Sequence, residues 1–307
     1  MIRNAIAFHL PSGWPFGAAE TAELLSRRVF VPGGAHQLES DGFVPARADA
    51  ELCHAVQGRY LMRHRVEEKL LPASVISDFV AARVAEIESE HGYRPGRKER
   101  NEIKEQVVLE LLPQAFRRHK DTFVWVSPEN GLLVVDSGSS SKADAVLSCM
   151  REALENLPVS PLDTERDPGS VLASWLVDGA AVDPLELGTD CKLVAPSGER
   201  AAVVYTRSDI GVDEVRQHVL DGKRPEHVGL CFDDRLSFLA TSRLELKRLA
   251  ALDALIGAQD ELDHESEQFD ADFLLMADPI ERAVLALVGA CGGFAKRDPD
   301  LLTQGEQ

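Results

Sequence analysis

The feature that most constrains the fold is a pair of helical segments at residues 73–112, which are inserted between strand-like runs. The stretch ASVISDFVAARVAEIESE repeats apolar residues at a helical period, and RKERNEIKEQVVLELL is a second helix that is charged at its start. The turn HGYRPG separates the two segments, because Gly and Pro interrupt helices. We therefore expect a helical hairpin. Its charged half has little apolar surface to bury, so we expect the hairpin to project from the body.

Strand-like runs surround this hairpin and continue through the last third of the chain. ELCHAVQGRYLMRHRVEEKLLP contains two apolar runs around a glycine, and TFVWV and LLVVD flank the turn Asn130-Gly131, a strong hairpin signal. CKLVAPSGERAAVVYTRS reads as a further hairpin, and an apolar helix, DPIERAVLALVGACGGF, closes the chain. This succession predicts an α+β fold with mainly antiparallel sheets and flanking helices.

A stretch rich in Pro and Asp, PVSPLDTERDPGS, is the best internal boundary, and 307 residues suffice for two or three domains. Together with the hairpin, this boundary divides the chain into three regions. They are a central α+β region at 1–72 plus 113–167, the helical hairpin (the tip) at 73–112, and a C-terminal α+β region (the base) at 168–307.

The overall charge and the start of the chain bound where such a protein acts. A formal charge of −18 argues against a nucleic-acid partner for the chain as a whole, because phosphate contacts need Lys and Arg. The start MIRNAIAFHL lacks the apolar region and cleavage site of a signal peptide, and no run approaches the roughly 18 apolar residues of a membrane helix. The five cysteines never form CxxC, which is typical of reduced thiols. We therefore expect a cytoplasmic protein.

The sequence carries no signature of catalysis, of a cofactor or of a metal site. DSGSSSK at 136–142 lacks the GxxxxGK[ST] spacing of a phosphate loop, and no GxSxG, GxGxxG or HExxH motif is present. We expect no catalytic residue, no cofactor and no metal, and hence not an enzyme. The carboxylates of Asp270, Asp272 and Asp278 leave a metal-dependent nuclease open as a weaker alternative.

Charges are segregated along the chain. Residues 94–120 contain eight Lys or Arg against four Glu, whereas residues 253–281 contain ten acidic residues and no Lys or Arg. Such segregation favours one basic surface on an acidic body, but ordinary solvated faces explain any single patch equally well. The acidic tract leaves open a protein-interaction module that binds a basic partner. In LLPQAFRRHKDTFVWV, Phe116 lies between a helix and a strand pattern, and the pattern allows either a core role or a ligand contact.

Five stretches, in order and at the appropriate spacing, resemble the bacterial recombination-associated protein RdgC family. The stretches are EEKLLPASVI (67–76), LLPQAF (111–116), NGLLVVD (130–136), LPVSPL (157–162) and FDADFLLM (269–276). The resemblance extends to Phe294 and is weakest around 181–260. It implies a ring-shaped homodimer closed by two separate contacts. The hairpin is the candidate for one contact and the C-terminal third for the other.

The resemblance also implies a function. Members of the family bind double-stranded DNA with little sequence preference, with the duplex passing through a basic hole, and they bind single-stranded DNA as well. They are nucleoid-associated and restrain RecA-type recombinases by occupying DNA. The resemblance implies neither catalysis nor a cofactor.

Site residues follow from the resemblance residue by residue. Phe116 in LLPQAF falls on an aromatic that faces the hole, and Gln114 takes a position that is often basic. The Arg-Arg-His-Lys run that follows can compensate for Gln114, while YTRSD and LDGK match basic or polar positions of the family. The candidate DNA-binding residues are Phe116, Arg117, Arg118, Lys120, Arg207, Ser208 and Lys223.

Overall fold

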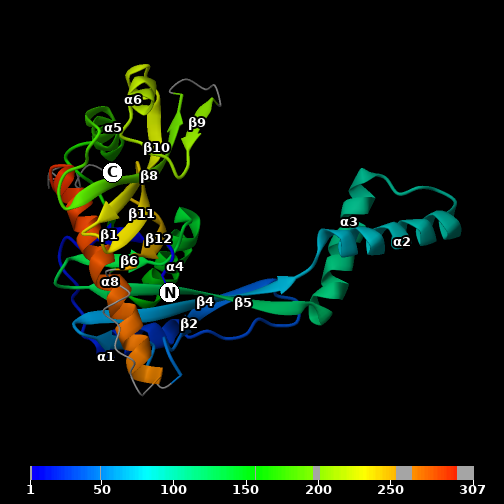
Figure 1. Ribbon diagram of the computed structural model, residues 1–307. Helices are drawn as coiled ribbons and strands as arrows, with labels where there is room; N and C mark the ends of the chain where they lie inside the picture. The colour runs from blue at the N-terminus through cyan, green and yellow to red at the C-terminus, as the bar shows by residue number, and fades with distance from the viewer. Residues whose placement is uncertain (1, 49, 156, 196–200, 254–264, 296–307) are drawn as a thin grey trace, which may run out of the picture.

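The computed structural model describes the whole chain except residues 1, 49, 156, 196–200, 254–264 and 296–307 (Figure 1). Within the described part, the chain forms two sheets and seven α-helices, and every pair of strands within a sheet is antiparallel. The α+β prediction with mainly antiparallel sheets is therefore confirmed.

The first sheet belongs to the N-terminal half of the chain. Its strands are β1 (Ile6–His9), β2 (Glu39–Val44), β3 (Cys53–Val56), β4 (Arg59–Leu70), β5 (Phe116–Ser127), β6 (Leu132–Val135) and β7 (Ser160–Pro161). The order is β2-β4-β5-β6-β1-β7, and β3 also pairs with β4.

The second sheet follows in the C-terminal half. It contains β8 (Leu185–Val194), β9 (Ala202–Tyr205), β10 (Arg224–Phe232), β11 (Leu236–Thr241) and β12 (Leu246–Ala251), in the order β12-β11-β10-β8-β9. A short bridge joins the two sheets, since the backbone of Ala5 exchanges hydrogen bonds of 2.8 and 2.9 Å with Leu246.

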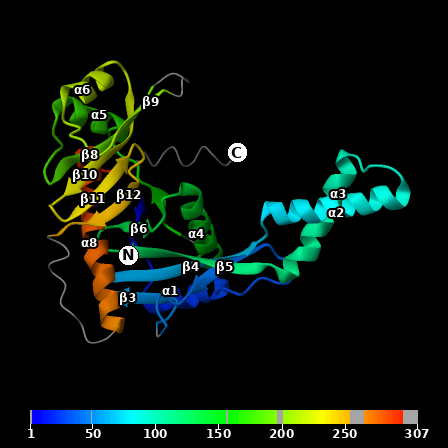
Figure 2. The same ribbon diagram turned by 45° about the vertical axis from the view of Figure 1, so that its right-hand side comes forward.

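The helical hairpin consists of α2 (Ala73–His91) and α3 (Arg97–Leu111), joined after Gly92, whose φ of 70° suits a glycine at the helix end. It has a small core of its own, made of Val84, Ile103 and Val107 with flanking apolar residues. Both ribbon views show it projecting from the body, as the sequence predicts (Figures 1 and 2).

The hairpin is carried by the outer halves of β4 and β5, residues 63–70 and 116–123, which we call the stalk (Figure 1). The sequence pattern placed the start of this strand at TFVWV, but β5 already begins at Phe116. Charged residues obscured the strand, because they pair with charged partners on β4 instead of alternating with apolar ones. β6 joins β5 only at Val124–Ser127, so residues 116–122 of β5 pair with β4 alone among the described strands.

The remaining helices cover the sheets. They are α1 (Ala18–Leu25), α4 (Ser140–Ala153), α5 (Pro168–Asp178), α6 (Asp213–Leu220) and α8 (Glu265–Ala290). One face of the first sheet packs its apolar residues, among them Met62 and Val124, against α1 and α4. The opposite face, with Leu61 and Trp125, shares a core with α5, α8 and the second sheet. The hairpin thus has a separate core, whereas the central and C-terminal regions share one, and the division into three regions stays a prediction.

Helix α8 begins earlier than the sequence indicates. Pro279 suggested a helix start near Asp278, yet α8 runs from Glu265 through this proline and ends before Gly292 and Gly293. Packing outweighs the missing backbone donor, because α8 buries residues on both sides of the proline, from Phe273 to Val288. None of the helices in the described residues has the length and apolarity that a membrane crossing requires.

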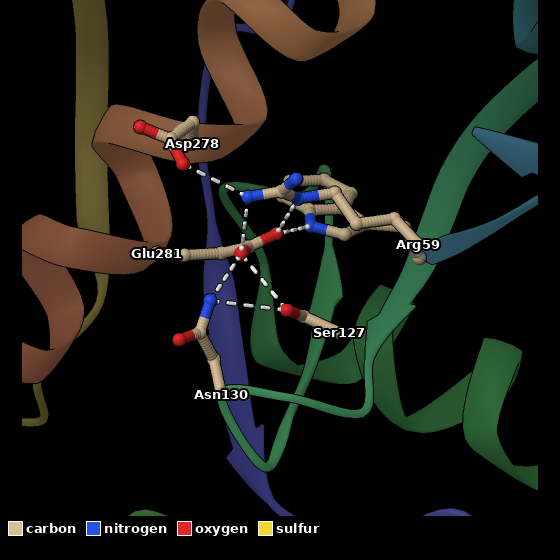
Figure 3. A network of polar contacts seen from close by, with 6 residues as sticks. Arg59, Ser127, Asn130, Asp278 and Glu281 are labelled. Atoms are coloured by element: carbon tan, nitrogen blue, oxygen red, sulfur yellow. Dashed lines mark hydrogen bonds and ion pairs between the residues drawn. The ribbon is translucent and has the colours of Figure 1, made fainter. Parts of the chain in front are cut away.

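The buried carboxylate of Glu281 fixes α8 to the first sheet (Figure 3). Arg59 donates to it from Nε at 2.9 Å and from Nη2 at 3.0 Å, and Asn130 donates from Nδ2 at 2.7 Å. The indole of Trp125 and the hydroxyl of Ser127 add hydrogen bonds of 2.8 and 2.9 Å. A buried charge is tolerated when its hydrogen bonds are satisfied in this way, so the network explains why an acid lies in the core.

Candidate nucleic-acid interface

Phe116 is the first residue of β5 and lies at the outer end of the stalk. Its side chain is 83% exposed, the largest value among the exposed large apolar residues of the described chain. A core role, which the sequence pattern left open, is therefore excluded for this residue. An aromatic ring held in water on a regular strand is available to a ligand.

The register of β4 and β5 decides which neighbours share a face with Phe116. Phe116 lies opposite Leu70, Arg118 opposite Glu68 and Lys120 opposite Val66. Residues directly opposite each other, and residues two apart along a strand, point to the same side of a sheet. Phe116, Arg118 and Lys120 therefore share one side with Glu68, and we call these four residues the aromatic face.

Arg117 lies on the reverse face of the stalk. It pairs opposite Lys69, and His119 pairs opposite Glu67, so the odd-numbered residues of β5 point away from Phe116. The sequence analysis placed Arg117, Arg118 and Lys120 together among the candidate DNA-binding residues. The structure brings Arg118 and Lys120 together with Phe116 and separates Arg117 from them.

A single carboxylate joins the two cations of the aromatic face. Arg118 Nη2 lies 2.9 Å from Glu68 Oε2, and Lys120 Nζ donates to Glu68 Oε1. The side chains of Arg118, Lys120 and Glu68 are 51%, 39% and 27% exposed. Hydrogen bonds from Arg118 and then Lys120 hold the pKa of Glu68 below its usual value.

Glu67 on the reverse face has a different environment. It is buried and accepts hydrogen bonds from His119 Nε2 at 3.0 Å, Arg117 Nη1 at 3.2 Å and the backbone N–H of Gly33 at 3.0 Å. These contacts, led by the one from His119, lower the pKa of Glu67. Since Glu67 also holds the loop around Gly33 against the stalk, its role includes a structural one.

The reverse face contains two further arginines that sequence reasoning did not place in the site. Arg65 forms two hydrogen bonds of 2.7 Å to Asp121, whereas Arg63 Nη1 lies 3.6 Å from the same carboxylate. Burial lowers the pKa of Arg63. The guanidinium of Arg65 also lies over the ring of Phe30, at 5.8 Å. The basic composition of residues 59–69 was the only signal in the sequence for these side chains.

The remaining candidates form a second group on the C-terminal sheet. Arg207 and Ser208 follow β9, where Arg207 takes a turn conformation with φ of 52° and the Ser208 N–H donates to Thr189 O at 3.0 Å. Lys223 lies between α6 and β10, with Nζ 3.0 Å from His218 Nδ1. Figures 1 and 2 show β9 and α6 far from the outer end of the stalk. Within one chain, this group is therefore not brought together with Phe116.

Three acidic residues of α8, Asp270, Asp278 and Glu281, contact bases of their own chain. Asp270 accepts from His54 Nε2 at 2.8 Å and lies 3.1 Å from Arg47 Nη1, and Asp278 lies 3.0 Å from Arg59 Nη2. Asp272 accepts from Gln268. Residues 254–264 of the predicted acidic tract lie outside the described residues.

One group of side chains in the described chain has the spacing of metal ligands, namely Asp41, His64 and Cys149. Arg28 lies against it, with Nη2 3.0 Å from Asp41 Oδ1 and a hydrogen bond to Cys149. Burial raises the pKa of Cys149 to about 11. The guanidinium already supplies the positive charge, so this group fits an ion-paired cluster.

Comparisons with known proteins match nearly the whole chain. The family model RdgC, described as "Putative exonuclease, RdgC", matches residues 1–294. The Recombination-associated protein RdgC of Dechloromonas aromatica is 39% identical over 295 residues, which cover 95% of this chain and 97% of the relative. Proteins of the same name from Cupriavidus necator and Bordetella pertussis are each 35% identical, over 96% and 95% of this chain and 99% and 98% of their own lengths.

Proposed function

This chain belongs to the RdgC family of recombination-associated proteins, and from that premise we propose that it binds duplex DNA as a ring-shaped homodimer with little sequence preference. It also binds single-stranded DNA in this proposal, associates with the nucleoid in the cytoplasm and restrains RecA-type recombination by occupying DNA. No catalytic step, metal or cofactor is part of the proposal.

The observation that carries the proposal is the aromatic face. Phe116 exposes 83% of its surface, and Arg118 and Lys120 lie two and four residues further along the same side of the strand. An exposed apolar ring has no stabilising role of its own in the free chain. Beside two cations, it suits a nucleic acid, because the cations neutralise phosphates while the ring stacks on bases or enters a groove.

In this proposal, the affinity for DNA comes mainly from contacts between basic side chains and the charged phosphates of the DNA backbone. Contacts to phosphates fix the position of a protein on DNA and carry no sequence information, which accounts for weak sequence preference. Arg118 and Lys120 are the contacts nearest to Phe116, and Arg117 reaches phosphate only where the duplex also meets the reverse face. Arg207, Ser208 and Lys223 are proposed as a second set of contacts from the base.

Exposed apolar side chains support two places for contact with a second copy. On the hairpin, Phe79, Tyr93 and Leu109 are each 51% exposed. On the C-terminal sheet, β9 is an edge strand, and its Val204 is 59% exposed. These exposed side chains are available to an interface between chains. The two places lie on the two ends of the molecule, as a ring with two contacts requires (Figure 1).

The two alternatives receive less support. In the described part of the acidic tract, Asp270, Asp278 and Glu281 contact bases of the same chain, which leaves fewer carboxylates for a basic partner. A nuclease is named in the description of the family model, so catalysis needs a direct test. Among the described residues, the group of side chains with the spacing of metal ligands contains no carboxylate of α8.

A salt series on plasmid DNA tests the proposal against both alternatives. We expect a gel shift whose binding constant falls steeply with salt, with a slope of about −0.9 per neutralised phosphate on a logarithmic plot. Added Mg²⁺ should leave both the circular plasmid and a linearised copy intact, because an exonuclease needs a free DNA end. Degradation of either DNA would support the nuclease, and absence of binding even at low salt would contradict the DNA clamp.

A further inference from the structure

Glu68 is an acid in the middle of a face that is proposed to bind an acid. It lies directly opposite Arg118 on β5 and directly opposite Glu39 on β2. Two like charges facing each other across a sheet are unfavourable unless a cation compensates them. Arg118 and Lys120 supply that compensation, one at each carboxylate oxygen of Glu68.

Glu67 and Glu68 differ in burial and in the kind of partner that each carboxylate contacts. Glu67 is 4% exposed and accepts a backbone N–H from Gly33, so its contacts belong to the folded stalk. Glu68 is 27% exposed, and its ion-pair partners are two long side chains that are about half exposed. Exposed ion pairs contribute little to folding, so Arg118 and Lys120 can exchange partners without disturbing the strands.

We propose that the Glu68 carboxylate occupies, in the free protein, the place of a DNA phosphate between Arg118 and Lys120, and thereby limits the affinity for DNA. The inference rests on the proposed function, because it assigns a competitor to the same contacts. A carboxylate and a phosphate both offer oxygen acceptors to such cations, so the geometry that holds one suits the other.

DNA binding then exchanges one anion for another. When phosphates take Arg118 and Lys120, Glu68 loses its partners and remains beside the backbone, where like charges repel. Binding by Arg118 and Lys120 therefore releases fewer counterions from the DNA than binding by two unpaired cations would. A ring closed around a duplex stays on it without tight contacts, and such weakened contacts favour movement along the DNA.

The test compares Glu68→Gln with Glu39→Gln. Both changes remove one negative charge from the same row of the sheet, but only Glu68 bridges Arg118 and Lys120. With a short duplex of random sequence in a fluorescence anisotropy titration, we expect E68Q to bind roughly three- to tenfold more tightly at low salt. Its salt slope should steepen by up to about 1.8, the value for two additional phosphates. E39Q should change affinity far less.

Three outcomes would count against the inference. If E68Q binds as the wild type does, or if E39Q strengthens binding equally, Glu68 is not a specific competitor. If the wild type binds no DNA, the proposed function itself fails, which is a different result. Thermal melting checks that each variant is folded, and Glu68→Ala serves as a second variant if E68Q is unstable.

A double-mutant cycle gives an independent measurement. Arg118→Gln should weaken binding only slightly in the wild-type background, where Arg118 is shared with Glu68. In the E68Q background the same change should cost more, because the freed arginine contacts phosphate fully. Equal losses in the two backgrounds would contradict the competition.

Discussion

At the scale of single residues, Phe116 and Glu281 both depart from the usual distribution of apolar and charged side chains. Glu281 is fully buried, but the chain surrounds it with donors from Arg59, Trp125, Ser127 and Asn130. Its position is thus explained within the folded chain. Phe116 is exposed and has no comparable explanation, which makes it the stronger candidate for a contact outside the chain.

Phe116→Ala should weaken DNA binding and leave the fold intact. Stacking of one base on an aromatic residue contributes about 1–3 kcal/mol, so we expect a loss of roughly fivefold to a hundredfold in affinity. The ring is 83% exposed, so the free energy of unfolding should change by less than about 0.5 kcal/mol. Anisotropy titration and urea unfolding measure the two quantities. A large loss of stability, with DNA affinity unchanged, would contradict this role.

At the scale of elements, charged side chains pair across β4 and β5 along the stalk. Glu67 and Glu68 on β4 face cations on β5, and Asp121 on β5 faces Arg65 on β4. The pKa values of all three carboxyl groups are lowered by these partners. A lowered carboxyl pKa makes the folded state depend on pH, because the folded state keeps the group ionised at pH values where the unfolded chain takes up a proton.

Acid should therefore loosen the stalk, and Glu67→Gln should remove part of this dependence. The contribution of Glu67 is fully present above its unfolded pKa, which is about 4.3, and is lost as the pH falls through its lower folded pKa. Melting curves from neutral pH down to about pH 3 should show the wild type losing its advantage over E67Q in that acidic range. A stability difference between the two proteins that stays constant with pH would contradict this.

The sequence predicted the elements whose signals are local. Periodicity in 73–91 and 97–111, with a Gly/Pro turn between, predicted the helical hairpin, and Asn130-Gly131 predicted the turn before β6. The start of β5 was missed because its stabilising partners lie on another strand. The start of α8 was missed because the packing that tolerates Pro279 comes from the rest of the core.

The candidate site was predicted only in part. The family resemblance made Phe116 a candidate, and the basic run next to it was visible in the sequence. The counter-charges were not predicted as partners, since Glu67 and Glu68 lie about 50 residues away from the cations that they contact. Nor did the sequence separate Arg117 from Arg118, because alternation of faces follows only when the segment is known to be a strand.

At the scale of the whole molecule, the hairpin stands apart from the body. The stalk carries it away from both sheets, and its core shares no residue with the two cores of the body (Figure 2). The hairpin is thus a separate structural unit at the end of an arm. In the proposed ring, we expect such a unit to supply one closure without affecting the fold of the rest.

Replacing residues 71–115 with Asn-Gly should give a folded protein that dimerises less well. Leu70 and Phe116 face each other across the two strands, so a two-residue turn can join them. Sedimentation equilibrium should show a weaker dimer, and plasmid binding should become less resistant to salt. Phe79→Ser is a smaller change with the same expected direction. A shortened protein that dimerises as the wild type does would place both contacts elsewhere.

The open side of β5 has a further consequence, which concerns solubility. Among the described strands, residues 116–122 have a partner on one side only, and an unpaired strand edge is a template for another chain to add to the sheet. The run Arg117-Arg118-His119-Lys120 occupies this edge, and its cationic side chains discourage such addition. We therefore expect these residues to disfavour aggregation whether or not DNA is present. Replacing all of them with neutral residues should increase aggregation as well as lower the affinity for DNA.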